Sequence, residues 1–207
     1  FFKWLGSGAG NGPFIELGDG SVKYDLITGI GVNFFGHGNL ELFEAELDGL
    51  WCNVHQGNLG PNPEYPRLMK LLLESVGEKS RLKHAWLTTC GATANEIALK
   101  IIRQKKSPAT KILAFKDTFA GRTTALQELT DNAKYREGQP TYGEVHYLPF
   151  YDMRSKVSAA EQAKAVLVIM KEELARHPGK FACLEFEPVQ GEGGFNAAPR
   201  EFLLPII

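Results

Sequence analysis

The chain has 207 residues and a net charge of −1; 43% of its residues are hydrophobic and 23% are charged. This balance is typical of a globular protein with a sizeable core and excludes an intrinsically disordered chain. A charge this close to zero offers no basic surface for nucleic acid and no polybasic patch for a membrane, so we expect neither partner. The longest apolar runs, such as residues 165–170, fall far short of the ~20 residues that a membrane-spanning helix needs.

The cysteines indicate the cellular compartment of the protein, and the chain ends indicate whether the sequence is part of a longer chain. Cys52, Cys90 and Cys183 are too few and too scattered for a disulfide framework or a paired metal site. We therefore expect reduced thiols and a cytoplasmic protein. No secretory signal is visible from Phe1, and the apolar end at Ile207 has no polar tail. Both ends look cut, so we expect a piece of a longer chain.

A glycine-rich stretch occupies residues 6–12. The dinucleotide-binding pattern G-x-G-x-x-G fails there, because Asn11 and Pro13 stand where the third glycine is needed. The stretch also precedes a predicted strand instead of following one. We therefore predict a flexible linker or loop.

Two strands, two helices and a loop are predicted next. Residues 14–17 and 22–27 are strand-like, and the Asp-Gly step between them is typical of a tight hairpin turn. Residues 39–51 have the pattern of a helix, and residues 57–66 form a loop rich in glycine and proline. A helix follows this loop, with apolar residues recurring on one side from Leu68 to Val76.

From residue 84 onward, strands alternate with helices. Apolar residues recur with helical spacing after Ala94 and over residues 159–174, where the helix ends at His177. The predicted strands are residues 84–89, 111–116, 144–150 and 181–186. This order predicts an α/β fold with a mostly parallel sheet and helices on both faces. We expect two parts: a small N-terminal region with a connecting loop over residues 1–60, and a larger α/β region over residues 61–207.

The predicted site lies where strands end, because ligands of open α/β sheets bind beyond the carboxyl ends of the strands. The first strand exit runs through Cys90 directly into a helix that begins with Gly91 and Ala92. Free N–H groups and the positive end of the helix dipole make such a start suitable for phosphate. An ordinary helix cap in which Thr93 or Asn95 takes part would look the same in the sequence.

The second and third exits carry an aromatic ring, a guanidinium and a carboxylate. Phe119 can stack on a planar ring, and Arg122 can bind a carboxylate through two parallel hydrogen bonds. Glu187 ends a predicted buried strand, where an unpaired carboxylate would cost several kcal/mol, and three glycines follow it closely. Each of these residues could instead have no role in binding. Phe119 could be a core aromatic, Arg122 a surface arginine, and Glu187 a solvated residue of a tight turn.

Other site motifs are missing from the sequence. Lys180 follows a glycine but precedes Phe181, which excludes a P-loop. The five histidines have neither H-x-H nor H-E-x-x-H spacing, so we expect no metal site. The sequence has no G-x-S-x-G nucleophile elbow.

Taken in order and at their spacing, the three exits resemble the class III aminotransferases. These are pyridoxal-phosphate enzymes of the acetylornithine, ornithine and 4-aminobutyrate group. The resemblance covers nearly the whole chain. Its residues are 91–96 (Gly-Ala-Thr-Ala-Asn-Glu), 119–123 (Phe-Ala-Gly-Arg-Thr) and 187–194 (Glu-Pro-Val-Gln-Gly-Glu-Gly-Gly), with residues 24–32, 36–37 and 58–59 also similar to the family.

The resemblance implies a role for each matching residue. Gly91 and Ala92 would bind the cofactor phosphate through their backbone N–H groups. Phe119 would stack on the pyridine ring, Arg122 would bind the substrate carboxylate, and Glu187 would lie beside the ring. The implied fold is the first part of the large domain of a fold type I pyridoxal-phosphate transferase, and the implied assembly is a homodimer.

The sequence departs from the family at two positions and stops before two others. Cys90 stands where the family usually has Ser or Thr, and Thr93 where it often has Glu. Backbone contacts to a phosphate survive both changes, but a hydroxyl contact at position 90 does not. We expect Glu192 to be structural. In the family, the Schiff-base lysine and the aspartate that pairs with the pyridine nitrogen lie beyond the position of Ile207. This segment therefore holds no catalytic residue of its own, and residues 1–207 alone are expected not to transaminate.

The intact protein is expected to move an amino group from an amino acid or ω-amino acid, of the acetylornithine or ornithine kind, to a 2-oxo acid. Two alternatives stay open. One is another pyridoxal-phosphate reaction on the same scaffold, such as that of an aminomutase or a racemase. The other is a truncated, non-catalytic relative with a binding or structural role.

Overall fold

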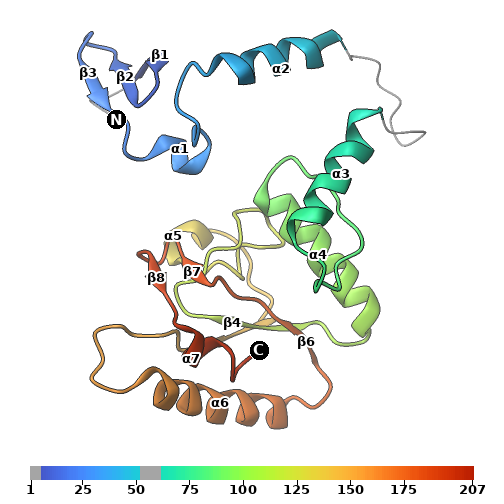
Figure 1. The fold of residues 1–207 in the computed structure, drawn as a ribbon. Coiled ribbons are helices and arrows are strands. Elements are labelled where there is room, and N and C mark those ends of the chain that lie inside the picture. The colour runs from blue at the N-terminus through green and yellow to red at the C-terminus, as the bar shows by residue number, and fades with distance from the viewer. Residues whose placement is uncertain (1–5, 52–61) are drawn as a thin grey trace. The chain divides into compact units, whose positions relative to one another are not determined.

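The computed structural model describes residues 6–51 and 62–207 (Figure 1). The chain forms two compact units, residues 1–85 and 86–207. No helix within the described ranges is long and apolar enough to cross a membrane.

The first unit contains the predicted hairpin. Strands β2 (Phe14–Leu17) and β3 (Val22–Tyr24) pair antiparallel. The turn closes where the Leu17 amide donates to the Ser21 carbonyl at 2.8 Å. β3 ends at Tyr24, three residues earlier than predicted. There the Asp25 carboxylate accepts hydrogen bonds from the next backbone amides, 3.0 Å from Ile27 N and 2.8 Å from Thr28 N, and turns the chain out of the sheet.

The prediction of a linker over residues 6–12 is wrong. Residues Gly6–Asn11 form strand β1, which pairs antiparallel with β2 and completes a three-stranded sheet in the order β1-β2-β3. The glycines permit close packing: a Cβ added to Gly10 would lie 2.8 Å from Cβ of His37. The glycine-rich composition of this segment indicated a flexible chain, but hydrogen bonding to β2 makes it a strand. The strand preference of a sequence depends strongly on such context.

Three helices complete the described part of this unit: α1 (Thr28–Gly31), α2 (Leu40–Trp51) and α3 (Glu64–Ser75). The predicted helix over residues 39–51 is confirmed by α2. The predicted loop over residues 57–66 lies largely outside the described residues, and its last three residues are helical. Pro66 fits there, because the first turn of a helix needs no amide donor at that position.

The second unit is built on a parallel sheet in the order β5-β4-β6. The central strand β4 (Lys111–Phe115) pairs in parallel with β5 (Val145–Leu148) and β6 (Phe181–Leu184). These strands fall within the predicted ranges, and the expectation of a parallel sheet is confirmed.

Helices cover both faces of this sheet, as predicted (Figure 1). Helix α4 (Gly91–Lys106) packs through Leu99 onto the face that carries Ile112 and Ala114. Helix α6 (Ala159–Arg176) packs onto the opposite face, together with the short helix α7 (Arg200–Leu203). Successive β4 residues point to opposite faces, so each face receives its own apolar cluster.

The predicted strand over residues 84–89 is not formed. A strand exists only as part of a hydrogen-bonded ladder, and no strand of the described chain pairs with this segment. Its two large apolar residues are exposed, Trp86 to 74% and Leu87 to 44%. Four short elements of this unit were not predicted: helices α5 (Ala133–Arg136) and α7, and the paired strands β7 (Val189–Gln190) and β8 (Asn196–Ala197).

Candidate functional site

All three predicted strand exits belong to the unit of residues 86–207, although the first, at the start of α4, follows no strand. After β4 the backbone turns sharply at Asp117, whose φ of 60° is unusual for a residue other than glycine. The Asp117 amide donates to the Asp131 carboxylate at 3.0 Å, which holds this turn. The chain is thereby directed from the central strand into the segment that carries Phe119 and Arg122.

The start of α4 has the features of an anion site. Cys90 is its extended N-cap residue, and the Cys90 amide donates to Oγ1 of Thr93 at 3.3 Å. Among the described residues, the Gly91 and Ala92 amides donate to no oxygen acceptor, and a Cβ added to Gly91 would meet open space. The backbone amide of Thr93 and then its hydroxyl hold the pKa of the Cys90 thiol below its usual value. The helix start therefore stabilises negative charge.

The segment after β4 packs directly against this helix start. A Cβ added to Gly121 would lie 2.8 Å from Cβ of Ala92 and 2.8 Å from Cδ1 of Leu126, so only glycine fits. The Asn95 amide group donates to the Ala120 carbonyl at 2.8 Å. The first and second exits are thus brought together, and Asn95 serves this contact instead of capping the helix.

A single buried hydroxyl fixes the path of that segment. Thr130, 1% exposed, accepts hydrogen bonds through Oγ1 from the amides of Ala120 (3.0 Å) and Gly121 (3.1 Å). The same hydroxyl donates to the Gly121 carbonyl at 2.6 Å. The Thr130 side chain thus satisfies two amides and one carbonyl of the same turn. These hydrogen bonds hold the backbone next to Phe119 in one conformation.

Glu187 binds the backbone of Phe119. Its carboxylate oxygen Oε2 accepts from the Phe119 amide at 2.9 Å and from the Thr118 hydroxyl at 3.1 Å. Two donors satisfy this half-buried carboxylate. Glu187, which was expected at the end of a buried strand, is therefore not an unpaired carboxylate. The second and third exits therefore meet, and two residues predicted to bind the cofactor, Phe119 and Glu187, are in direct contact.

Tyr135 joins Phe119 to Arg122. The Tyr135 ring meets the Phe119 ring edge to face, with centroids 6.1 Å apart. The Arg122 guanidinium carbon lies 5.7 Å from the centroid of the same tyrosine ring, within range of a cation–π contact. Arg122 is otherwise exposed and has no carboxylate partner among the described residues. Its donors are available to a ligand.

A second carboxyl group, Glu185, lies beside Glu187. Its Oε2 accepts from the Thr118 hydroxyl at 3.4 Å, so both glutamates share one hydroxyl. Burial, followed by the nearby charge of Glu187, raises the pKa of Glu185 to about 7. Residues two apart on an extended segment point to the same side, and this spacing is the signal that could have identified Glu185.

The third exit closes against the turn after β4. A Cβ added to Gly193 would lie 2.7 Å from the Asp117 carbonyl oxygen, and the buried Gln190 amide group donates to the Lys116 carbonyl at 2.7 Å. Oε1 of Gln190 is buried and accepts no hydrogen bond from the described residues. A cavity of about 70 Å³ lies here, and its lining includes Phe119, Tyr135 and Glu192.

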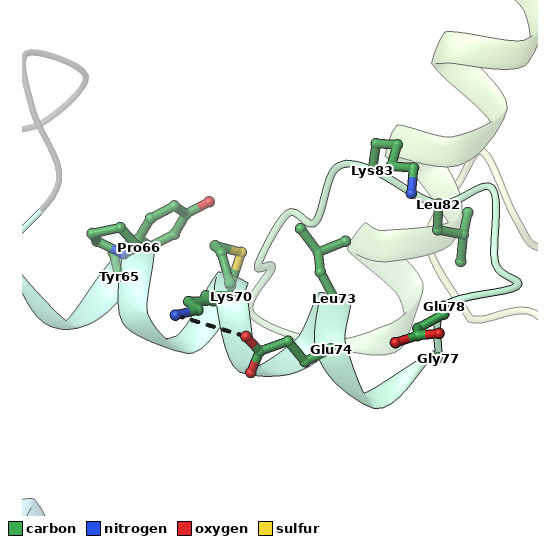
Figure 2. A pocket seen from close by; sticks show the side chains of 10 residues that line it. Tyr65, Pro66, Lys70, Leu73, Glu74, Gly77, Glu78, Leu82 and Lys83 are labelled. Carbon is green, nitrogen blue, oxygen red and sulfur yellow. Dashed lines mark ion pairs between the residues drawn. The ribbon is translucent and has the colours of Figure 1, made fainter.

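A larger cavity lies elsewhere, in the first unit (Figure 2). It measures about 870 Å³, is lined from Tyr65 to Lys83, and includes none of the predicted site residues. Its polar groups include the exposed pair of Lys70 and Glu74, 3.7 Å apart. Size alone is therefore a poor guide to the chemistry of this molecule.

Of the residues that matter here, the sequence pointed to Gly91, Ala92, Phe119, Arg122 and Glu187. It missed Glu185, Tyr135, Thr130 and Gln190. Tyr135 and Thr130 lie on a segment without a strand or a motif, so no sequence pattern linked them to the site. Asn58 and Leu59, which also carried the resemblance, lie outside the described residues.

The parallel sheet covered by helices on both faces, with a helix start at its carboxyl edge, is the architecture of fold type I pyridoxal-phosphate transaminases. The chain is similar to the solved (S)-enantioselective omega-transaminase from Thermomicrobium roseum, with a TM-score of 0.85 at 25% identity. That match covers 98% of this chain and 46% of the solved one.

The chain belongs to the class-III aminotransferase family, whose family model matches residues 7–206. It is 34% identical over 197 residues to the acetylornithine aminotransferase of Bacillus amyloliquefaciens, which covers 93% of this chain and 75% of that protein. It is 35% identical over 188 residues to the 2-aminoadipate transaminase of Pseudomonas putida, covering 89% of this chain and 44% of that protein. The chain thus spans less than half of this second relative and of the solved transaminase.

Proposed function

We propose that the intact protein is a pyridoxal-phosphate-dependent aminotransferase, which moves an amino group from an amino acid or ω-amino acid to a 2-oxo acid. Pyridoxal phosphate is the cofactor of the class III family. The observation that carries the proposal is the direct contact of Phe119 with Glu187, next to a helix start where the Gly91 and Ala92 amides donate to no oxygen of the described residues. We further propose 2-oxoglutarate as the amino acceptor.

The residues present fit the cofactor. The amides of Gly91 and Ala92 and the open space above Gly91 suit a phosphate group. The half-buried Phe119 ring suits a flat heterocycle, and Glu187 fixes the backbone that carries this ring. When bound, the cofactor supplies the electron sink for amino-group chemistry, and the protein supplies binding and orientation.

Arg122 is proposed to bind the carboxylate of the amino donor. Its guanidinium faces Tyr135 through its π-face contact, which leaves its N–H donors for a planar anion. Lysine keeps the charge but lacks the paired donors. In the intact protein, Arg122→Lys should raise KM for the amino donor at least tenfold, while Arg154→Lys, at another exposed arginine, should leave it unchanged. An unaltered KM in Arg122→Lys would remove this role.

The covalent step of amino transfer needs the lysine that binds the cofactor. In the family, the lysine that binds the cofactor lies beyond the position of Ile207, and no lysine of residues 1–207 has a matching context. A polypeptide of residues 1–207 is therefore proposed to bind the phosphate group but not to catalyse amino transfer. Turnover by that polypeptide, shown by mass to be free of longer forms, would contradict this point.

We propose a homodimer in the cytoplasm as the working form. Large apolar side chains are exposed in residues 26–51, among them Leu26 (88%), Ile30 (83%) and Trp51 (87%). Exposed apolar groups in this number are typical of surfaces that a partner covers. The free thiols of Cys90 and Cys183 fit a reducing compartment. Light scattering of the purified intact protein should give twice the chain mass.

A further inference from the structure

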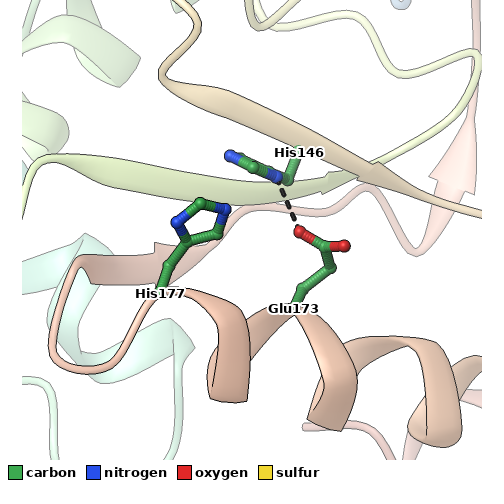
Figure 3. A group of neighbouring side chains, drawn as sticks. All are labelled: His146, Glu173 and His177. Atoms are coloured by element: carbon green, nitrogen blue, oxygen red, sulfur yellow. Dashed lines mark hydrogen bonds and ion pairs between the residues drawn. The ribbon is translucent and has the colours of Figure 1, made fainter.

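Two histidines and a glutamate come together at the amino edge of the parallel sheet (Figure 3). His146 lies on β5, Glu173 lies in the last turn of α6, and His177 is the residue at which this helix ends. One potential ligand atom from each side chain lies within 4.8 Å of the other two, and all three residues are half-buried. His146 Nδ1 and Glu173 Oε2 are 2.9 Å apart.

The arrangement matches the donors and spacing of known zinc chemistry. His177 directly follows the last residue of α6, and its amide donates to the Glu173 carbonyl, which keeps the two residues close. Two imidazoles and a carboxylate are a common donor set for Zn²⁺. The Glu173 carboxylate is already placed for such a site: its Oε2 lies 2.9 Å from Nδ1 of His146, and its Oε1 accepts from Arg176.

We propose that His146, Glu173 and His177 form a binding site for one divalent transition-metal ion, with Zn²⁺ as the preferred ion and water as the fourth ligand. Ligand atoms around tetrahedral zinc lie about 2.0–2.2 Å from the metal. Small rotations of the three side chains bring the present atoms to that distance. The Phe181 ring, with its centroid 5.1 Å from that of His146, shields one side of the site.

Two neighbouring cationic side chains affect the metal affinity of this site. Lys111 Nζ lies 3.2 Å from Nε2 of His146 and 2.9 Å from the Gly143 carbonyl oxygen, and Arg176 binds the Glu173 carboxylate. When Nδ1 of His146 binds the metal, Nε2 carries the proton and no longer accepts from Lys111. Both positive charges also repel a dication. Lys111→Met should therefore tighten metal binding at least threefold.

The position of the site indicates a structural role. Lys111 is the first residue of β4 and His146 the second of β5, so the site lies at the amino ends of the strands. The candidate cofactor site lies at the carboxyl ends of the same sheet. A metal ion here would link the end of α6 to β5, and the family's amino-transfer chemistry would not use it. No H-E-x-x-H motif marks this site, because His146 and Glu173 lie on different elements, 27 residues apart in the chain.

The test is a titration of the untagged, metal-free chain with zinc chloride, followed by calorimetry. We expect one Zn²⁺ per chain with a micromolar or lower Kd. His177→Gln should weaken binding at least tenfold, and His84→Gln, at an exposed histidine outside the site, should not change it. His177 ends the helix instead of filling the core, so its variant should fold, which the circular dichroism spectrum would check.

A second readout distinguishes the ligands. Cobalt chloride should give the visible absorption of a tetrahedral site with nitrogen and oxygen ligands, and zinc should raise the Tm of the parent chain but not that of His177→Gln. Three results would overturn the proposal: no saturable binding of zinc, equal affinity of His177→Gln and the parent, or a thiolate charge-transfer band that is lost in Cys90→Ala. The last would place the metal on a cysteine.

Discussion

Glu185 is the residue whose environment most clearly alters its chemistry. It shares the Thr118 hydroxyl with Glu187, and Glu187 already holds the Phe119 amide. Two carboxylates this close cannot both be charged without cost, and burial adds to that cost. The raised pKa of Glu185 reflects this cost, while the Glu187 carboxylate accepts the hydrogen bond of the Phe119 amide.

The pKa of Glu185 predicts a pH-dependent stability. The folded pKa, about 7, lies above the ordinary value of 4.5, so the protonated group favours the folded state at low pH and this contribution is lost as pH rises through 7. Glu185→Gln should leave the free energy of unfolding unchanged at pH 4 and raise it by about 1–3 kcal/mol at pH 8. Urea unfolding at both pH values measures this. Glu137→Gln, at an exposed carboxylate, is the control; an equal effect of Glu185→Gln at both pH values would contradict the account.

Gly193 and Gly191 form a matched pair within one loop. A Cβ at Gly193 would lie 2.7 Å from the Asp117 carbonyl oxygen, whereas a Cβ at Gly191 would meet open space, and neither residue has a positive φ. Gly193→Ala should lower the free energy of unfolding by about 1–3 kcal/mol through forced displacement of backbone. Gly191→Ala should stay within about 0.5 kcal/mol of the parent in the same urea titration. Similar losses in both would mean that the third exit does not pack on the turn after β4.

Among the helices and strands, α4 contributes to the candidate site through the backbone amides of its first turn. Its amide groups lower the pKa of the Cys90 thiol, whereas burial raises that of Cys183. The exposed thiol at the helix start therefore reports on the same N–H groups that would bind phosphate.

This contrast predicts selective alkylation. At pH 7.5, iodoacetamide should modify Cys90 at least tenfold faster than Cys183, because the thiolate is the reactive form and Cys90 is exposed. Inorganic phosphate bound at the helix start should slow the reaction at Cys90 and leave Cys183 unaffected. Peptide mass spectrometry over time gives both rates. Phosphate that changes neither rate would argue against an anion site at this helix.

The elements that could be predicted are those with a strong local pattern. Helices α4 and α6 have apolar residues at helical spacing, and α6 also has the capping box of Ser158 and Glu161, in which the Ser158 amide donates to the Glu161 carboxylate at 3.2 Å. Strands β4, β5 and β6 are short, apolar and bounded by turns. The two failures, residues 6–12 and 84–89, depended on whether a partner strand was present, and no local pattern contains that information.

For the molecule as a whole, the site could be predicted only in outline. The order and spacing of three motifs placed five residues at strand exits, and the fold brings those exits together. Glu187 was expected beside the pyridine ring of the cofactor, but its hydrogen bond to the Phe119 backbone depends on packing between segments 68 residues apart. Tyr135, Glu185 and the ligands of the proposed metal site share no motif, so only the folded chain reveals them.

The central claim is that the start of α4 and the ring of Phe119 bind the phosphorylated pyridine cofactor. The most direct measurement is a calorimetric titration of residues 1–207 with pyridoxamine 5′-phosphate, which lacks the aldehyde and therefore does not react with lysines. We predict saturable binding of one molecule per chain. Phe119→Ala should weaken it at least tenfold, equivalent to about 1.4 kcal/mol, and Tyr142→Ala, at an exposed aromatic outside the cavity, should not. Absent binding, or equal affinity in Phe119→Ala and the parent, would contradict the claim.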